Sequence, residues 1–367
     1  MRTLRFELQF LAGVVTGVAF LLFGKTWLGD LSQPLSTGAL FLWLFAVMLW
    51  SSFGVVRHAD GLAILLGEPL GTLILTVAVI TIEVIMIAAV MLTGENNPAL
   101  ARDTMFAVIM VVLNGMAGLS VLLGGLKHRE PAFNLQGANA YLGILVPLAV
   151  LTLVVPRYTR AAPGGIPGPA LAVFLLVVCV VLYLVFLGIQ TMRHRHYFMQ
   201  PGEDGEPGHD HDDHDFTIRS VPYHAVFLIL TMIPIVLLSK SMAKIVDHGI
   251  EGAGLPTALG GLLVAVLVLS PEGLAAFKAA RANQLQRSIN ISMGSALATI
   301  SLTVPAVLVI GMFTGREVEL GLGQLDMVLL LLTLGTMIVN ASSQRTNILQ
   351  GVVHLTLFAT YLVLLFD

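Results

Sequence analysis

Two glutamates lie in stretches of the chain that are otherwise apolar. Glu83 is the one charged residue in residues 71–92, a run long enough to cross a bilayer. Glu272 has a comparable setting in the second half of the chain, directly after Ser270-Pro271. A charged side chain at the centre of a bilayer costs about 2.5–3.5 kcal/mol on insertion scales, so such residues normally have a partner or a function. A buried carboxylate can hold a proton or bind a cation, and each occupant excludes the other.

Small polar residues follow each glutamate in the next apolar stretch of the sequence. Asn114 lies in the segment NGMAGLS, and Ser295 and Thr299 lie in the segment GSALATIS. Their oxygen atoms are suitable ligands for Ca2+, which prefers about six to eight oxygens at about 2.3–2.6 Å. Close packing of membrane helices also selects small residues, and this explanation stays open for each of them. The candidate site for a transported ion consists of Glu83, Glu272, Asn114, Ser295 and Thr299.

A proline and a histidine also bear on this candidate site. Pro271 lacks a backbone N–H, so the sequence predicts an interruption of the helix just before Glu272, which would free carbonyl groups for an ion. His354 lies in the last apolar stretch of the chain. We interpret it as a hydrogen-bonded packing residue, with a role in proton relay as the alternative.

The composition indicates the class of protein. Of 367 residues, 56% are hydrophobic and 11% are charged, and the mean hydropathy is +0.89. Average soluble domains are about 25% charged, so we predict an all-α polytopic membrane protein. The net charge of -3 comes with no basic tract, which argues against nucleic acid as a partner. The expected partners are inorganic cations, protons and the lipid bilayer, and a homo-oligomer is compatible with the sequence.

The apolar stretches predict about eleven transmembrane helices, each close to the 17–25 residues or so that span a bilayer. The first follows a basic N-terminus but precedes no small-residue cleavage site, so we keep it as a membrane helix. Under this topology 12 Lys and Arg residues lie on the side of the N-terminus and 7 on the other side. This bias places the N-terminus in the cytoplasm and the C-terminus outside. The predicted helices cover residues 8–24, 36–56, 70–92, 104–125, 138–155, 169–191, 223–243, 255–278, 288–312, 325–343 and 348–366.

A polar linker separates two groups of five predicted helices. It contains an acidic tract in which His209, Asp210, His211 and His214 could hold a regulatory metal such as zinc or nickel. The simpler interpretation is a solvated tether between two membrane halves. Because each half has an odd number of helices, the second would enter the membrane inverted relative to the first. The predicted division is an N-terminal helix in residues 1–30, a first repeat in 31–191, a cytoplasmic linker in 192–221 and a second repeat in 222–367.

Three segments of the chain resemble one family of transporters. They are residues 269–278 (LSPEGLAAFK), 293–305 (MGSALATISLTVP) and 67–76 (GEPLGTLILT). They are similar to the ChaA-type calcium/sodium–proton antiporters, in the cation/proton exchanger branch of the calcium/cation antiporter superfamily. The resemblance implies two inverted repeats that exchange a cytosolic cation for protons in the bacterial inner membrane. It matches Glu83 and Glu272 to the paired glutamates of the family, Ser295 to the second repeat and Asn114 to the comparable place in the first.

The charge of the glutamate pair suggests how exchange would work. Two carboxylates balance one Ca2+ or two protons, and a monovalent ion would leave one carboxyl group protonated. A site that opens alternately to each side would then export Ca2+, and also Na+ or K+, in exchange for protons. No permanently bound cofactor is expected.

Other functions remain as alternatives. A Na+ or K+/proton antiporter with little Ca2+ activity would use the same pair of glutamates. A cation channel also lines its pore with acidic residues, but its flux needs no counter-moving proton. An enzyme is not expected, because Ser295 has no histidine at a matching depth and the His/Asp tract lies in a loop.

Overall fold

The computed structural model describes residues 7–66, 70–93, 98–160, 163–201 and 219–366. Within these ranges the protein is built of helices, and the only strand-like pairing is an isolated bridge between Ala132 and Arg345. Among the described residues, eight helices are long and apolar enough to cross a membrane. Three shorter apolar stretches accompany them, at Val77–Ala88, Gln324–Asn340 and Ile348–Leu364. The prediction of an all-α polytopic membrane protein is confirmed.

Each predicted span overlaps an observed helix or a run of consecutive helical segments. The long segments are α2 (Leu8–Trp27), α3 (Pro34–Leu66), α4 (Leu70–Thr93), α5 (Leu100–Ile109), α6 (Ala117–His128), α7 (Leu135–Leu153), α9 (Pro169–Gly188), α10 (Val221–Ala253), α11 (Ala258–Arg281), α12 (Leu285–Ala298), α13 (Val304–Thr314), α14 (Gln324–Asn340) and α15 (Ile348–Leu364). The short segments are η1 (Met110–Met116), α8 (Val155–Tyr158), η2 (Pro163–Gly165), η3 (Ile189–Arg193), η4 (Arg195–Phe198) and η5 (Thr299–Thr303).

The two halves of the chain repeat the same succession of elements. The first helices, α3 and α10, each have 33 residues, and the second helices, α4 and α11, each have 24. The third helix of each half contains a wider π-helical turn, η1 in the first half and η5 in the second. An internal duplication produces this kind of correspondence. The exact limits of the two repeats and of the linker stay predictions.

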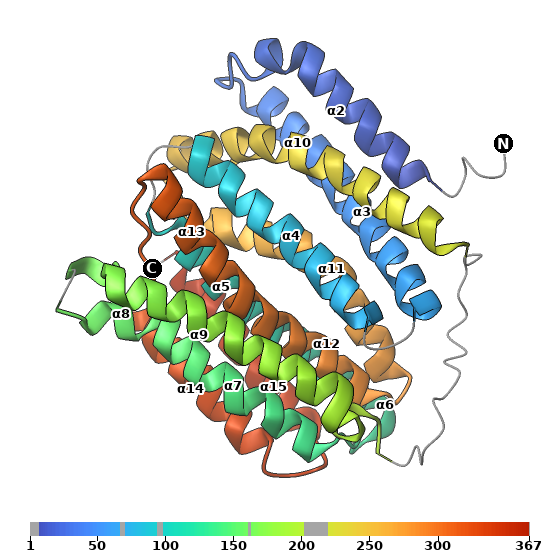
Figure 1. Ribbon diagram of the computed structural model, residues 1–367. Helices are drawn as coiled ribbons and strands as arrows, with labels where there is room; N and C mark the ends of the chain where they lie inside the picture. The colour runs from blue at the N-terminus through green and yellow to red at the C-terminus, as the bar shows by residue number, and fades with distance from the viewer. Residues whose placement is uncertain (1–6, 67–69, 94–97, 161–162, 202–218, 367) are drawn as a thin grey trace.

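The glutamate-bearing helices lie in the interior of the helix assembly. Figure 1 shows α4 and α11 between the pair formed by α3 and α10 and the group formed by α7, α9, α12 and α13. The N-terminal helix α2 packs on α3 and α10 at one edge of the molecule. The second glutamate helix, α11, also packs on α5 and α12. Both candidate glutamates are therefore carried by helices with neighbours on several sides.

The helices α3 and α10 extend beyond their predicted ends at residues 56 and 243. The extra turns of α3 contain Arg57 and His58, whose side chains are bonded to Glu7 in the N-terminal segment. The hydropathy of a single stretch does not reveal such partners, because they lie about 50 residues away in the sequence. Gly254, with φ of 61°, ends α10 in the left-handed conformation that glycine adopts most readily.

The predicted interruption before Glu272 is wrong, because α11 continues through Pro271. A proline inside a helix leaves the carbonyl four residues earlier without its usual donor. Here that carbonyl belongs to Leu267. The Ser52 hydroxyl of α3 donates to the Leu49 carbonyl of its own helix at 2.8 Å and makes only a long contact of 3.4 Å to the Leu267 oxygen. Glu272 nevertheless lies within an unbroken helix.

A close contact between α5 and α11 depends on a single glycine. A Cβ atom on Gly261 would lie 2.8 Å from the backbone nitrogen of Thr104 and 2.9 Å from its Cα. Backbone atoms cannot move aside as a flexible side chain can. The neighbouring Gly260 is different, since the nearest atoms to its Cβ would be side-chain carbons of Ile250 and Val246 at 3.6 and 3.7 Å.

We predict that Gly261→Ala destabilises the protein and that Gly260→Ala does not. Overpacking typically costs about 1–3 kcal/mol, whereas replacing a helical glycine by alanine without a clash gains about 0.5–1 kcal/mol. Thermal unfolding of the two variants in the same detergent would measure the difference. Equal unfolding midpoints would show that α5 and α11 do not make the close contact described.

Candidate functional site

Glu83 is buried in α4 and is held by two threonine hydroxyls. Its side chain is 1% exposed. Thr299 Oγ1 donates to Glu83 Oε2 at 2.9 Å, and Thr303 Oγ1 donates to Glu83 Oε1 at 3.1 Å. Both carboxylate oxygens therefore face the third helix of the other half of the chain.

The two threonines are the first and last residues of the π-helical turn η5. Such wide turns occur mostly as single turns inside α-helices, often at functional sites. Pro305 follows at the start of α13, and its missing N–H leaves a preceding carbonyl without an α-helical donor. A wider turn next to this proline brings Thr299 and Thr303 to the same carboxylate.

Glu272 is buried in α11 and has a single hydroxyl partner. It is 9% exposed, and Ser295 Oγ donates to its Oε2 at 2.8 Å. Ser295 lies in α12, one turn before Thr299, so one face of this helix serves both glutamates. The structure thus brings together Glu83, Glu272, Ser295 and Thr299 of the sequence-predicted set.

The negative charge of the pair is not balanced by a basic side chain. No described Lys, Arg or His forms an ion pair with Glu83 or Glu272. The two carboxylates are bonded to the same helical run, because Ser295, the partner of Glu272, and Thr299, a partner of Glu83, are four residues apart. Burying a charge without a partner is very costly, so the pair requires bound protons or a bound cation.

The hydroxyl partners suit either occupant. A Ser or Thr hydroxyl can donate to a carboxylate, accept from a protonated carboxyl group, or turn a lone pair toward a cation. Sequence reasoning missed Thr303, although its spacing of four residues from Thr299 places both on one side of a helix. With Thr303 included, the site offers three hydroxyl groups around two carboxyl groups.

Asn114 lies in a separate cluster in the described structure. It is fully buried in η1, its Nδ2 donates to Thr333 Oγ1 at 2.8 Å, and its Oδ1 is 2.9 Å from His354 Nδ1. The other ring nitrogen of His354 is 2.8 Å from Asn340 Nδ2. His354 is thus a buried histidine with both nitrogens bonded, and the role of Asn114 as an ion ligand stays a prediction.

The predicted regulatory metal site in the linker lies outside the described residues, because it consists of His209, Asp210, His211 and His214. In the remainder of the chain, no group of three His, Cys, Asp or Glu side chains is placed to hold a metal ion. The single cysteine, Cys179, is buried in α9 as its apolar surroundings suggest.

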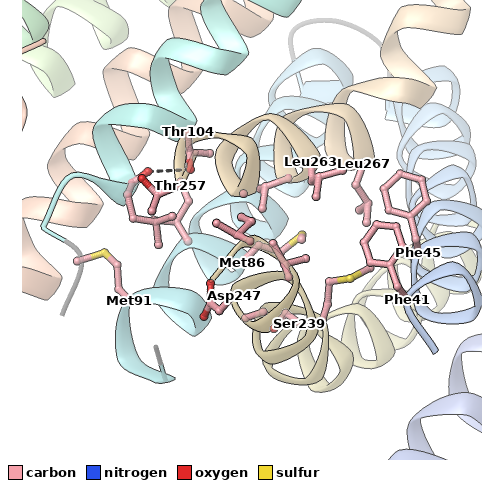
Figure 2. A pocket seen from close by; sticks show the side chains of 18 of the residues that line it. Phe41, Phe45, Met86, Met91, Thr104, Ser239, Asp247, Thr257, Leu263 and Leu267 are labelled. Carbon is pink, nitrogen blue, oxygen red and sulfur yellow. Dashed lines mark hydrogen bonds between the residues drawn. The ribbon is translucent and has the colours of Figure 1, made fainter. Parts of the chain in front are cut away.

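A cavity of about 290 Å3 lies between α3, α4, α10 and α11. Figure 2 shows Met86 of α4 and Asp247 of α10 at this cavity, with Phe41 and Phe45 of α3 on another side. Met86 belongs to the helical turn that follows Glu83, and Glu251, four residues after Asp247, also lines the cavity. The carboxylates of Asp247 and Glu251 in its lining would favour cations in this cavity.

We predict that Thr303→Val weakens the binding of a cation to the purified protein. Valine keeps the shape of threonine and removes the hydroxyl, and a hydrogen bond to a charged group contributes about 1.5–3 kcal/mol. The dissociation constant should therefore rise by about ten- to a hundredfold, as calorimetric titration with Ca2+ and with Na+ would measure. Thr152→Val is the matched control, since Thr152 is a buried threonine bonded to backbone carbonyls of its own helix. Unchanged affinity in Thr303→Val, or an equal loss in the control, would contradict this assignment.

Comparison with known proteins identifies similar transporters. A family model described as sodium/calcium exchanger protein matches residues 36–192 and 223–366. The sodium-potassium/proton antiporter ChaA of Escherichia coli (strain K12) is 43% identical over 319 residues, which cover 87% of this chain and 86% of that protein. The Ca2+/H+ antiporter ChaA of Bacillus subtilis (strain 168) is 22% identical over 90% of this chain and 94% of that protein.

Two solved structures share the fold. Native YfkE superposes with a TM-score of 0.74 at 20% identity, covering 98% of this chain and 99% of that one. The H+/Ca2+ exchanger CAX gives a TM-score of 0.70 at 13% identity, covering 98% of this chain and 88% of that one. At these identities the likeness concerns the arrangement of helices.

Proposed function

The chain belongs to the sodium/calcium exchanger protein family, and on this basis we propose that it is a secondary active antiporter that exchanges cations for protons. The observation that carries the proposal is the pair of buried glutamates, Glu83 and Glu272, which have hydroxyl partners and no basic partner in the described structure. Such a pair is neutral only when it holds protons or a cation. Competition between the two occupants couples their movements.

We propose Ca2+ as an exported ion, with Na+ and K+ as further ions at the same site. One Ca2+ would replace two protons, and one Na+ or K+ would replace one, so that the site stays neutral in each case. The relatives support both kinds of cargo, because one is named a sodium-potassium/proton antiporter and others are named Ca2+/H+ antiporters. Exchange of Na+ or K+ with little Ca2+ activity is the nearest alternative.

The proposed location is the bacterial inner membrane, since the relatives with the highest identities among those compared come from bacteria. The N-terminus would lie in the cytoplasm and the C-terminus outside, as the distribution of Lys and Arg indicates. A homo-oligomer stays compatible with the proposal. A transporter of this kind makes and breaks no covalent bond, so no enzymatic activity is proposed.

We predict that Glu83→Gln and Glu272→Gln each abolish cation-driven proton movement in everted membrane vesicles. Glutamine keeps the size of the side chain but can neither release a proton nor balance a cation. Addition of Ca2+, Na+ or K+ to vesicles with the parent protein should move protons, as a pH-sensitive dye would report.

The matched control is Glu130→Gln, because Glu130 is an exposed glutamate whose side chain pairs with Arg345 at the surface. It should retain the parent activity. Full exchange in a well-inserted Glu83→Gln or Glu272→Gln variant would refute the paired mechanism. Cation flux without any proton movement would instead favour a channel.

A further inference from the structure

A second buried polar cluster joins α2, α3 and α10, away from the glutamate pair. It contains Glu7 directly before α2, His58 of α3 and His224 of α10, which are 6%, 1% and 2% exposed. The three helices come together at this edge of the molecule (Figure 1). The proposed exchange does not use these residues, so their burial calls for a separate explanation.

A continuous chain of hydrogen bonds runs through the cluster. The backbone nitrogen of Arg219 donates to His224 Nε2 at 3.1 Å. His224 Nδ1 is 3.2 Å from His58 Nδ1, and His58 Nε2 is 3.0 Å from Glu7 Oε2. The chain thus links the residue that precedes α10 to the residue that precedes α2, by way of α3.

Charged and polar groups surround the two imidazoles. Glu7 also accepts from Arg57 Nη2 at 2.8 Å and from the Tyr223 hydroxyl. The guanidinium of Arg219 lies over the Tyr223 ring, 4.6 Å from its centre. The ionisable groups that act on the histidines are therefore Glu7 from the α2 end, Arg57 from α3 and Arg219 from the α10 end.

One arrangement of protons satisfies the whole chain. Because Arg219 donates to Nε2 of His224, this histidine must carry its proton on Nδ1 and donate it to His58 Nδ1. His58 then carries its proton on Nε2, where it can donate to the Glu7 carboxylate. In this arrangement both imidazoles are neutral and all their nitrogens are paired.

A further proton cannot enter the chain without breaking a contact. If His58 gains a proton on Nδ1, its new N–H points at the N–H of His224. If His224 instead changes tautomer, so that its Nδ1 accepts the new hydrogen bond from His58, its own proton moves to Nε2 and points at the N–H of Arg219. The same clash arises if His224 itself is protonated. Either the contact between the two helices or the contact to the residue before α10 is lost. A charged His58 would be repelled by Arg57, whose Nη2 lies 3.2 Å from His58 Nε2, and attracted by Glu7 at 3.0 Å.

The packing is built around the His224 ring. A Cβ atom on Gly61 of α3 would lie 2.6 Å from Cε1 and 2.7 Å from Nδ1 of His224, so glycine is needed for the ring to pack here. The ring of Phe227 in α10 stacks on that of His58, with centres 5.7 Å apart. The histidine pair is thus a tightly packed contact between the first helices of the two halves.

We propose that the hydrogen-bond chain Arg219–His224–His58–Glu7 is a pH-sensitive latch, which holds α2 and the start of α10 on α3 while both imidazoles are neutral and opens when either imidazole gains a proton. Burial lowers the pKa of both imidazoles, that of His58 to about 4, so the latch opens as the pH falls toward that value. It is a device of this fold that is separate from the exchange of ions at the glutamates.

The consequence for transport rests on the proposed function. Because α3 and α10 are the first helices of the two halves, an open latch frees the two halves to move relative to each other at this end. The exchange rate should then depend on the pH of the side on which α2 begins. The opening itself can be tested without any transport measurement, so failure of one proposal is distinguishable from failure of the other.

The test measures the distance between α2 and α10 by electron spin resonance of two spin labels. Val15→Cys on α2 and Val226→Cys on α10 are suitable positions, because these side chains are 67% and 53% exposed. The natural Cys179 is buried and does not compete for the label. The distance distribution should shift to longer and broader values when the pH is lowered from about 7 to below about 4, where His58 gains a proton.

The controls separate the latch from a general effect of acid. The double variant His58→Gln/His224→Gln should show the same distribution at both pH values, whereas His128→Gln should respond as the parent does, because His128 bonds to Arg281 at the end of α6. Labels at Leu126→Cys on α6 and Leu349→Cys on α15 should report a constant distance in the parent protein. A distance between α2 and α10 that does not change with pH in the parent protein would overturn the proposal. A pH response retained by the double histidine variant would also overturn it.

Discussion

The main constraint on this structure is the negative charge of two buried carboxylates that have no basic partner among the described residues. Glu83 and Glu272 lie on interior helices and are 1% and 9% exposed. A bilayer interior cannot stabilise this charge, so the site must hold protons or cations at all times. The requirement of neutrality excludes an empty site, and it makes the movement of one occupant conditional on the arrival of the other.

The surrounding helices fix the positions of the two carboxylates, whereas the hydroxyl groups bonded to them can either donate or accept a hydrogen bond. Glu272 lies on a continuous helix, which runs through Pro271. The partners of Glu83 come instead from a wide turn of the third helix, where Thr299 and Thr303 present hydroxyl groups that can donate or accept. The helices set the position of the negative charge, while the hydroxyls adjust to a proton or a cation.

The sequence predicts the features that depend on hydropathy and on local spacing. The membrane helices and the repeated succession of elements are of this kind, and the resemblance to a known family adds Ser295, 23 residues after Glu272. Contacts between distant parts of the chain could not be predicted in the same way. Thr299 and Thr303 reach Glu83 across 216 and 220 residues, and Asn114 is bonded to His354 across 240. Each of these depends on which helix faces which, and a single sequence does not specify that.

Proton release on cation binding tests the central claim most directly. Purified protein in a weakly buffered detergent solution would receive Ca2+ or Na+ while a pH indicator follows the free protons. At a pH where both glutamates are protonated, about two protons should be released for each Ca2+ bound and about one for each Na+. The variant Glu83→Gln/Glu272→Gln should release none. Cation binding by the parent protein without proton release would contradict the account, because the two occupants would then not share one site.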